Sequence, residues 1–316
     1  MAVLLVGFGG PNSMEEVRPF LDNVLKGRPV PPERYEEVVR QYEAVGGASP
    51  YNRQTFDFAE KLERRLDREG CPLPVYVGLR HTRPTFAETL ERMAADGISE
   101  AAGVILSSFR SEPSWDRYVE AVEEARAGVP GAPVVRPLAP WNDDDLFIQA
   151  LTDRVREGEA SIPEDGRRDA HWLFTAHSVP VEEDRRSGYA DQARRAAARA
   201  AEALGHENWS LCFQSRTGRP EQAWLEPDVG DAIASLDLSR SREVLVIPAG
   251  FLTDHMEVIF DLDVKARRRA EAARFAFHRA RTVGDHPAFL ELLTSRVRQA
   301  TISPGIDISQ RRAGTL

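Results

Sequence analysis

The sequence predicts an α/β protein with two doubly wound parallel sheets of similar topology, each of four strands. Short, nearly continuous apolar runs alternate with longer helical stretches, the pattern of parallel strands that crossover helices bury on both faces. The runs divide evenly between the two halves of the chain, without a repeat at the level of residues. The 316 residues exceed the roughly 250 to 300 at which a single core stops growing, so two domains are expected.

Each expected strand is a short apolar segment bounded by polar or turn residues. The strands of the first half are Ala2 to Gly7, Pro74 to Leu79, Ala102 to Ser107 and Val134 to Leu138. Those of the second half are Trp172 to Ala176, Trp209 to Gln214, Val244 to Pro248 and Phe275 to His278.

The intervening stretches have helical periodicity and supply the crossovers. The expected helices are Arg53 to Glu69, Pro84 to Asp96, Trp115 to Ala127, Asp143 to Arg156, Asp184 to Leu204 and Pro287 to Ala300. We place the first domain at 1–142 and the second at 143–286, with 157–169 as a surface connection. The helix at 287–300 is free to pack back on the first domain, and 301–316 is expected to be a frayed tail.

Composition excludes several classes of protein. The net charge is −9, and the 41 Lys and Arg are dispersed, which argues against a nucleic-acid partner. No run of eighteen apolar residues occurs and the start lacks a basic leader, so membrane spanning and secretion are disfavoured. Cys71 and Cys212 are too few for a disulfide framework, which favours a reducing cytoplasm.

Two strands of the second half end in ionisable residues: His177 follows one, and His255 and Glu257 follow another. Parallel sheets bind ligands at the carboxyl ends of their strands, so these side chains are expected in one crevice. A helix beginning near Thr253 would align Asp254, Glu257 and Asp261 on one face. Its other residues are largely apolar, and buried carboxylates need a cation, a proton or a partner. Residues alone therefore predict a metal-dependent or acid/base enzyme.

The loop Gly7 to Pro11 ends the first expected strand and lacks both the spacing of a dinucleotide fingerprint and the lysine of a phosphate loop. We interpret it as a tight turn that lets the backbone approach a ligand, with Phe8 as an aromatic surface.

Several ordered segments resemble the ferrochelatase family over nearly the whole chain. In the second half they are Thr175 to Pro180, Gln214 to Gly218, Trp224 to Asp228, Pro248 to Phe251 and Asp254 to Glu257. In the first half Phe8 to Pro11, Gly27-Arg28 and Tyr42 to Pro50 resemble the short coproporphyrin-type enzymes of monoderm bacteria. The resemblance implies two Rossmann-like, chelatase-type domains with a cleft between them, and insertion of Fe²⁺ into a porphyrin during haem synthesis.

The resemblance also implies roles for residues. His177 and Glu257 match the catalytic pair at the porphyrin centre and, with Asp261, the metal ligands; Asp254 and His255 would orient Glu257. Which of the pair takes the proton and which first binds iron stays open. Porphyrin contacts are implied for Phe8, Arg28, Gln41, Tyr42, Ser49, His81, Tyr118 and Trp224.

The chain departs from the family pattern at several positions. Lys265 stands where many relatives carry a third acid, Phe8 where some carry a metal-ligating tyrosine, and Leu25 where some carry a propionate-binding arginine. With two cysteines the chain cannot hold the four-cysteine iron–sulfur cluster of some relatives, so no resident cofactor is expected and Fe²⁺ is a substrate.

Alternatives remain at this point. One is a cobalt or nickel chelatase of another tetrapyrrole, and a second is a porphyrin or haem carrier without catalysis. Coproporphyrin III is favoured over protoporphyrin IX on resemblance alone. The protein is expected to be a monomer, and transient contacts with other haem-pathway enzymes are compatible with it.

Overall fold

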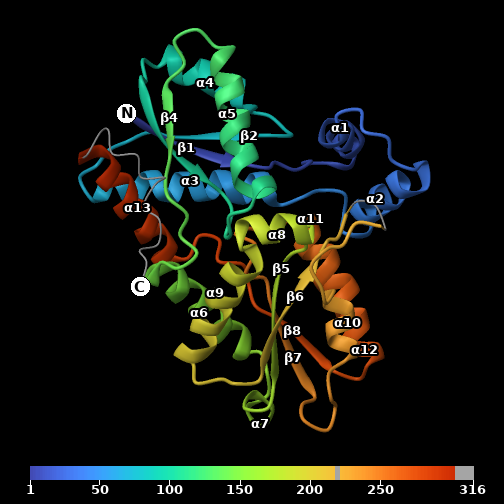
Figure 1. Ribbon diagram of the computed structural model, residues 1–316. Helices are drawn as coiled ribbons and strands as arrows, with labels where there is room; N and C mark the ends of the chain where they lie inside the picture. Colours follow the sequence, from blue (N-terminus) through green and yellow to red (C-terminus); the bar gives the residue numbers. More distant parts are fainter. Residues whose placement is uncertain (218–220, 303–316) are drawn as a thin grey trace. The chain divides into compact units, whose positions relative to one another are not determined.

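The computed structural model of the chain describes residues 1–217 and 221–302, which form two compact units, each around one parallel sheet (Figure 1). Unit 1 comprises Met1–Leu106, Glu112–Pro140 and the described residues from Phe289 onward. Unit 2 comprises Ser107–Ser111 and Trp141–Ala288. Residues 303–316, most of the expected tail, lie outside the described part.

The sheet of unit 1 has the strand order β2-β1-β3-β4, with all neighbours parallel. Its strands are β1 (Ala2–Gly7), β2 (Val75–Leu79), β3 (Glu100–Ile105) and β4 (Val134–Pro137). Every residue of β1 is buried, as a central strand covered on both faces requires.

The helices of unit 1 are α1 (Met14–Leu25), α2 (Pro32–Ala44), α3 (Tyr51–Arg68), α4 (Phe86–Ala95), the π-helix η1 (Glu112–Asp116), α5 (Arg117–Ala127) and α13 (Pro287–Ile302). Because parallel crossovers are right-handed, α3 lies on one face of the sheet and α4 and α5 lie together on the other. α13 packs on α3, where the rings of Phe58 and Phe289 stack with centroids 5.9 Å apart.

The sheet of unit 2 repeats this topology in the order β6-β5-β7-β8, again all parallel. Its strands are β5 (His171–His177), β6 (Trp209–Gln214), β7 (Glu243–Ile247) and β8 (Ala276–Arg279). The prediction of two four-stranded, doubly wound parallel sheets is therefore confirmed.

The helices of unit 2 are α6 (Asp145–Glu159), α7 (Glu164–Arg167), α8 (Val181–Ser187), α9 (Tyr189–Ala203), α10 (Val229–Ala234), α11 (Met256–Val258), the π-helix η2 (Ile259–Ala266) and α12 (Arg267–Ala272). α6 packs on α9, whereas α10 packs on η2 and α12. Val258 and Leu262 are fully buried in one core cluster with Leu173 of β5 and Val246 of β7. This apolar face anchors the segment that carries Glu257.

Some predicted elements were wrong in detail. The helix expected from Asp184 to Leu204 is two helices, because Gly188 adopts a left-handed φ of 63° that breaks it. The helix expected near Thr253 begins only at Met256 and soon becomes π-helical. The expected strand at Ala102 begins at Glu100 and ends at Ile105. α1, α2, α7 and α10 were not predicted; α7 lies within 157–169, which was expected to be a surface connection.

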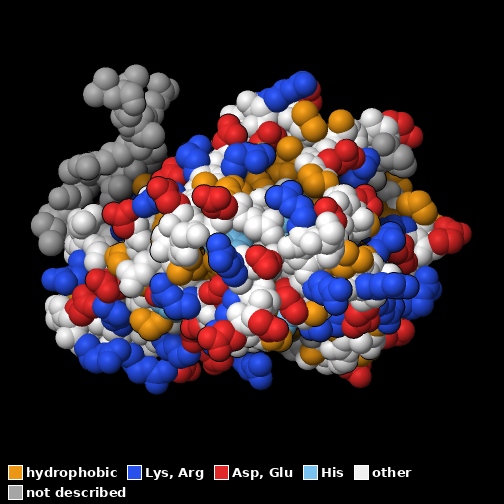
Figure 2. All heavy atoms as spheres, turned by 90° about the horizontal axis from the view of Figure 1, so that it is seen from below, with side chains coloured by type: hydrophobic (Ala, Val, Ile, Leu, Met, Phe, Trp, Pro, Cys, Tyr) orange, Lys and Arg blue, Asp and Glu red, His pale blue; other side chains and the backbone are white. Residues whose placement is uncertain are grey.

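The surface carries mixed charge. Figure 2 shows acidic and basic side chains interspersed over the face that it presents, in keeping with the dispersed Lys and Arg of the sequence. Across residues 1–217 and 221–302, no helix has both the length and the apolar character needed to cross a membrane.

Candidate active site

His177 is the last residue of β5, an interior strand of its sheet. Its Nδ1 atom lies 2.5 Å from the carbonyl oxygen of Ser178. A carbonyl oxygen can only accept, so Nδ1 carries a proton and donates it. The lone pair of the neutral imidazole is then on Nε2, the atom that can bind a metal or take a proton.

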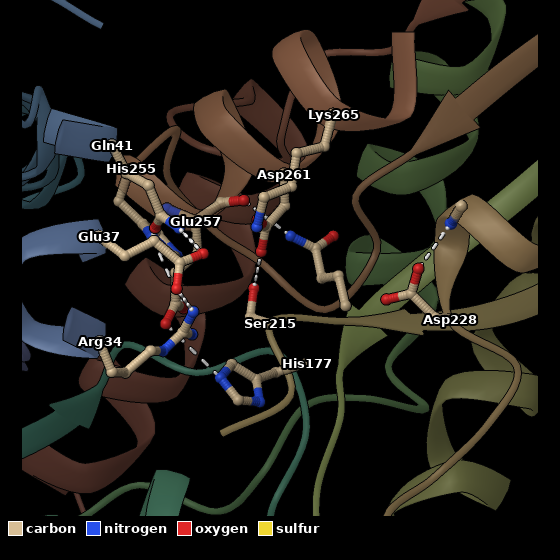
Figure 3. Close-up of polar contacts among 12 residues, drawn as sticks. Arg34, Glu37, Gln41, His177, Ser215, Asp228, His255, Glu257, Asp261 and Lys265 are labelled. Atoms are coloured by element: carbon tan, nitrogen blue, oxygen red, sulfur yellow. Dashed lines mark hydrogen bonds and ion pairs between the residues drawn. The ribbon is translucent and has the colours of Figure 1, made fainter. Parts of the chain in front are cut away.

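Glu257 faces that atom. Its Oε1 lies 3.6 Å from Nε2 of His177, and its Oε2 lies 4.0 Å from Nδ1 of His255 (Figure 3). His255 also caps α11, since its Nδ1 accepts the backbone N–H of Glu257 at 3.2 Å. The carboxylate therefore lies between two imidazoles, one from each of the two segments singled out in the sequence.

The electrostatics of the pair follow from burial and charge. Burial alone would lower the pKa of His177, but the Glu257 carboxylate outweighs it, and that pKa lies above its ordinary value. Burial would raise the pKa of Glu257, yet the charge of His177 lowers it to about 2. Burial lowers the pKa of His255. At neutral pH Glu257 is thus a carboxylate beside one histidine that protonates readily and one that resists protonation.

Gln214, at the end of β6, holds the backbone of Glu257 in place. Its amide oxygen accepts from the Thr175 hydroxyl and its amide nitrogen donates to the Glu257 carbonyl oxygen, both at 2.9 Å. The side chain is fully buried, so neither bond competes with water. Sequence reasoning assigned Gln214 no such task, although an amide ending an apolar strand was a usable signal.

Asp261 lies on η2, four residues after Glu257, and is bonded elsewhere. Its Oδ2 accepts from the Ser215 hydroxyl at 2.5 Å, and its Oδ1 accepts from the Lys265 ammonium at 2.9 Å (Figure 3). Among the residues that the structure describes, no group of three or more His, Cys, Asp or Glu could hold a metal ion. Within the described residues, His177 and Glu257 are thus two potential ligands at a strand end and not a complete metal site.

Asp254 does not share a helix face with Glu257, because the chain is still extended at this point. It pairs with Arg279 of β8, whose Nη1 donates to its Oδ1 at 2.9 Å. Nε of Arg279 donates to Asp263 of η2 at 2.6 Å. Arg279 therefore ties both flanks of the Glu257 segment to the sheet, a role that no local sequence pattern reveals.

Unit 1 gathers several of the predicted porphyrin contacts around one aromatic cluster. The Phe8 and His81 rings lie 4.5 Å apart, and Phe20, missed from sequence, lies 6.1 Å from Phe8 and 6.4 Å from Tyr42. Phe8 is 38% exposed, whereas His81 and Tyr42 are buried. Burial, with help from the charge of Arg80, lowers the pKa of His81 to about 4, so this histidine is neutral at neutral pH.

The loops beside this cluster carry unused polar atoms. Within the described residues, Nε of Arg80, Nδ1 of His81 and Oγ1 of Thr82 are buried and lack a hydrogen-bond partner. The Arg80 guanidinium lies 5.4 Å from the centre of the Tyr118 ring. Gly9 has a φ of 88°, and a side chain there would meet Thr82, so the loop is a tight turn, as interpreted from its sequence.

The other predicted contacts lie outside the aromatic cluster. Ser49 is buried and accepts the backbone N–H of Tyr51 at 3.3 Å. Arg28 is exposed just beyond α1, and Gln41 of α2 donates to Glu37 at 3.5 Å. Trp224 belongs to unit 2, where it forms a bridge with Pro180, three residues after His177.

Comparison with solved structures defines the class of fold. The chain is similar to the structure of CbiX, described as the terminal enzyme for biosynthesis of sirohaem in denitrifying bacteria, with a TM-score of 0.57, 17% identity, and coverage of 95% of this chain and 99% of that one. It is similar to SirB from Bacillus subtilis with Fe³⁺, with a TM-score of 0.57, 14% identity and coverage of 94% of each chain. The fold is that of the two-domain chelatases.

Sequence comparison is more specific. The ferrochelatase family model matches residues 1–301, and the chain belongs to that family. The coproporphyrin III ferrochelatase of Mycobacterium leprae is 42% identical over 305 residues, 95% of this chain and 89% of that protein. A ferrochelatase of Rhodopirellula baltica is 41% identical over 298 residues, 94% of this chain and 85% of that protein. The protein is thus an enzyme that inserts iron into a porphyrin.

Proposed function

We propose that this enzyme inserts Fe²⁺ into coproporphyrin III and that the pair of His177 and Glu257 carries out the insertion. The observation that carries the proposal is the approach of Nε2 of His177 to Oε1 of Glu257 at 3.6 Å, at a strand end. The names of the relatives from M. leprae and Nocardia farcinica, the latter 40% identical over 307 residues, support the choice of porphyrin.

The reaction requires the protein to accept protons and to distort the ring. The porphyrin loses two pyrrole N–H protons as its nitrogens take up Fe²⁺. Distortion of the ring exposes the nitrogen lone pairs to the ion. Nε2 of neutral His177 is a good ligand for a first-row divalent ion and also a base near neutral pH. Glu257 supplies the negative charge that stabilises either an arriving cation or a newly formed imidazolium.

Features of unit 1 support a carboxylate-rich aromatic substrate. The exposed Phe8 ring offers an apolar face to a macrocycle, and neutral His81 beside it avoids a buried charge. The Arg80 guanidinium, 5.4 Å from the centre of the Tyr118 ring, is a cation with which a substrate carboxylate could pair. Leu25 cannot perform this task, so we assign it to Arg80, with Lys26 and Arg28 as further cations.

The test is a direct comparison of substrates on the pure protein. Under anaerobic conditions Fe²⁺ is mixed with coproporphyrin III or protoporphyrin IX and the porphyrin spectrum is followed. The proposal predicts a kcat/KM at least tenfold higher for coproporphyrin III. Preference for protoporphyrin IX would refute the proposal that coproporphyrin III is the substrate. Tight porphyrin binding without turnover would refute the proposal that the protein inserts iron into it.

We also propose that the enzyme works as a cytoplasmic monomer without a resident cofactor. The two cysteines of the sequence support the absence of a four-cysteine cluster, and the mixed surface charge in Figure 2 suits an aqueous compartment. Analytical ultracentrifugation and metal analysis of the purified protein test both points. A stable dimer, or stoichiometric iron with inorganic sulfide, would contradict them.

A further inference from the structure

We infer that Lys265 acts as a tethered cation: its ammonium forms an ion pair with the carboxylate of Asp261. This carboxylate therefore does not bind divalent metal. The inference rests on the proposed function in one respect: it leaves the pair of His177 and Glu257 as the place where iron is bound in unit 2. It also revises the prediction that Asp261 is a metal ligand.

Both oxygens of Asp261 are in use. Lys265 Nζ donates to Oδ1 at 2.9 Å and Ser215 Oγ donates to Oδ2 at 2.5 Å. The Asp261 side chain is only 12% exposed, so the ion pair is partly shielded from water. A carboxylate in this setting requires a counter-charge, and the ammonium supplies it from one turn further along the same helix.

Lys265 is held in this position from two sides. Its ammonium is within 4.9 Å of the centre of the Phe260 ring, a cation–π contact that adds to the ion pair. The positive charge also acts on Glu257, whose pKa it helps to lower. A divalent ion at Asp261 would have to compete with the ammonium, because two positive charges at one carboxylate repel each other.

The backbone of Ser215 places its hydroxyl against the carboxylate of Asp261. It adopts a φ of 60°, in the left-handed region that a serine rarely enters. This backbone strain coincides with a short hydrogen bond to Asp261. The carboxylate is therefore oriented by a donor on one oxygen and charge-balanced by a lysine on the other. A divalent ion has to compete with that lysine for the carboxylate.

The structure points to a simple consequence: reversing the charge of Lys265 should create a metal site where none operates. In Lys265→Glu two carboxylates, four residues apart on η2, would be available to one ion. Asp261→Asn should matter for metal binding only in that variant. The matched control is Lys61→Glu on α3, in unit 1, which changes net charge by the same amount.

The experiment titrates Mn²⁺ alone into the full-length protein without porphyrin and measures free Mn²⁺ by electron paramagnetic resonance. In the wild type and in Lys61→Glu, adding Asp261→Asn should change Mn²⁺ affinity less than twofold. Lys265→Glu should gain one site at least tenfold tighter than any in the wild type, and Asp261→Asn should abolish it. Glu257→Gln should leave the gained site in place. Circular dichroism melting verifies that each variant is folded.

Two results would overturn the inference: loss of an Mn²⁺ site in wild type on Asp261→Asn, or no gain in a folded Lys265→Glu. Lys265→Gln provides a second check, because it removes the charge without adding a ligand. It should raise Mn²⁺ affinity, by a smaller factor than Lys265→Glu; unchanged affinity in both variants would exclude the tethered-cation role. Since no porphyrin is present, these results are independent of whether coproporphyrin III is the substrate.

Discussion

Nε2 of His177 and Oε1 of Glu257 lie 3.6 Å apart across the ends of two chain segments in unit 2. An ion bound about 2.1 Å from each atom, the usual distance for a first-row metal, would make an angle of roughly 120° with them. The separation is therefore compatible with one bridging ion. Sharing a proton would require the two atoms to approach to within about 3.2 Å. The charge interaction of the pair is seen in the raised pKa of His177 and the lowered pKa of Glu257.

Replacing Glu257 with Gln should lower the pKa of His177. Without the carboxylate, burial is the main influence left on the imidazole, and it disfavours the charged form. NMR titration of the metal-free protein measures this, with the His177 signal assigned by its absence in His177→Ala. Glu182→Gln, at an exposed carboxylate of α8, is the control and should leave the pKa of His177 unchanged. An unchanged pKa in Glu257→Gln would show that the two groups do not interact in solution.

Replacing Arg279 with Ala should destabilise unit 2 by about 2 to 4 kcal/mol, because it leaves two carboxylates, Asp254 and Asp263, without their shared cation. The expected loss of stability is smaller than for a fully buried network, since the side chains of Arg279, Asp254 and Asp263 are 17 to 28% exposed. Urea unfolding measures it. Arg268→Ala, an exposed position on α12, should cost less than about 0.5 kcal/mol. Equal effects of the two changes would refute the assigned role of Arg279.

His81 should make stability depend on pH. Its pKa is about 4 in the folded protein against 6.5 for the free group, so between these values the unfolded chain binds more protons. The contribution of neutral His81 is present above about pH 6.5 and is lost as pH falls through 4, by about 3 kcal/mol in total. Urea unfolding at pH 7 and pH 4.5 should show a smaller loss in His81→Asn than in wild type. Parallel losses would exclude burial of a neutral His81.

The sheets could be predicted because buried parallel strands appear in the sequence as short continuous apolar runs. The apolar run of β5 ends at His177, and that boundary alone placed the imidazole at a strand end. The break between α8 and α9 at Gly188 also had a local signal, a glycine within a helical pattern, but we predicted one continuous helix there. In the same way, the spacing of Asp261 and Lys265 was that of an ion pair on one helix face.

Other features depend on contacts between distant residues. Nothing near Asp254 in the sequence indicates that Arg279 binds it, and the resemblance to relatives instead suggested a partnership with Glu257. The capping of α11 by His255 depends on where the helix begins, and a change from α- to π-helical turns has no simple sequence pattern. Such details decide which groups surround Glu257, and only the structure reveals them.

The most direct test of the account is iron insertion by His177→Ala. Anaerobic turnover with coproporphyrin III is measured beside porphyrin affinity, taken from the quenching of protein fluorescence. If Nε2 of His177 takes part in insertion, kcat should fall by about 100-fold or more, the usual effect of removing a base or ligand, while porphyrin affinity changes only a few-fold. Near-native turnover by a folded His177→Ala would contradict the central claim that the pair of His177 and Glu257 inserts the iron.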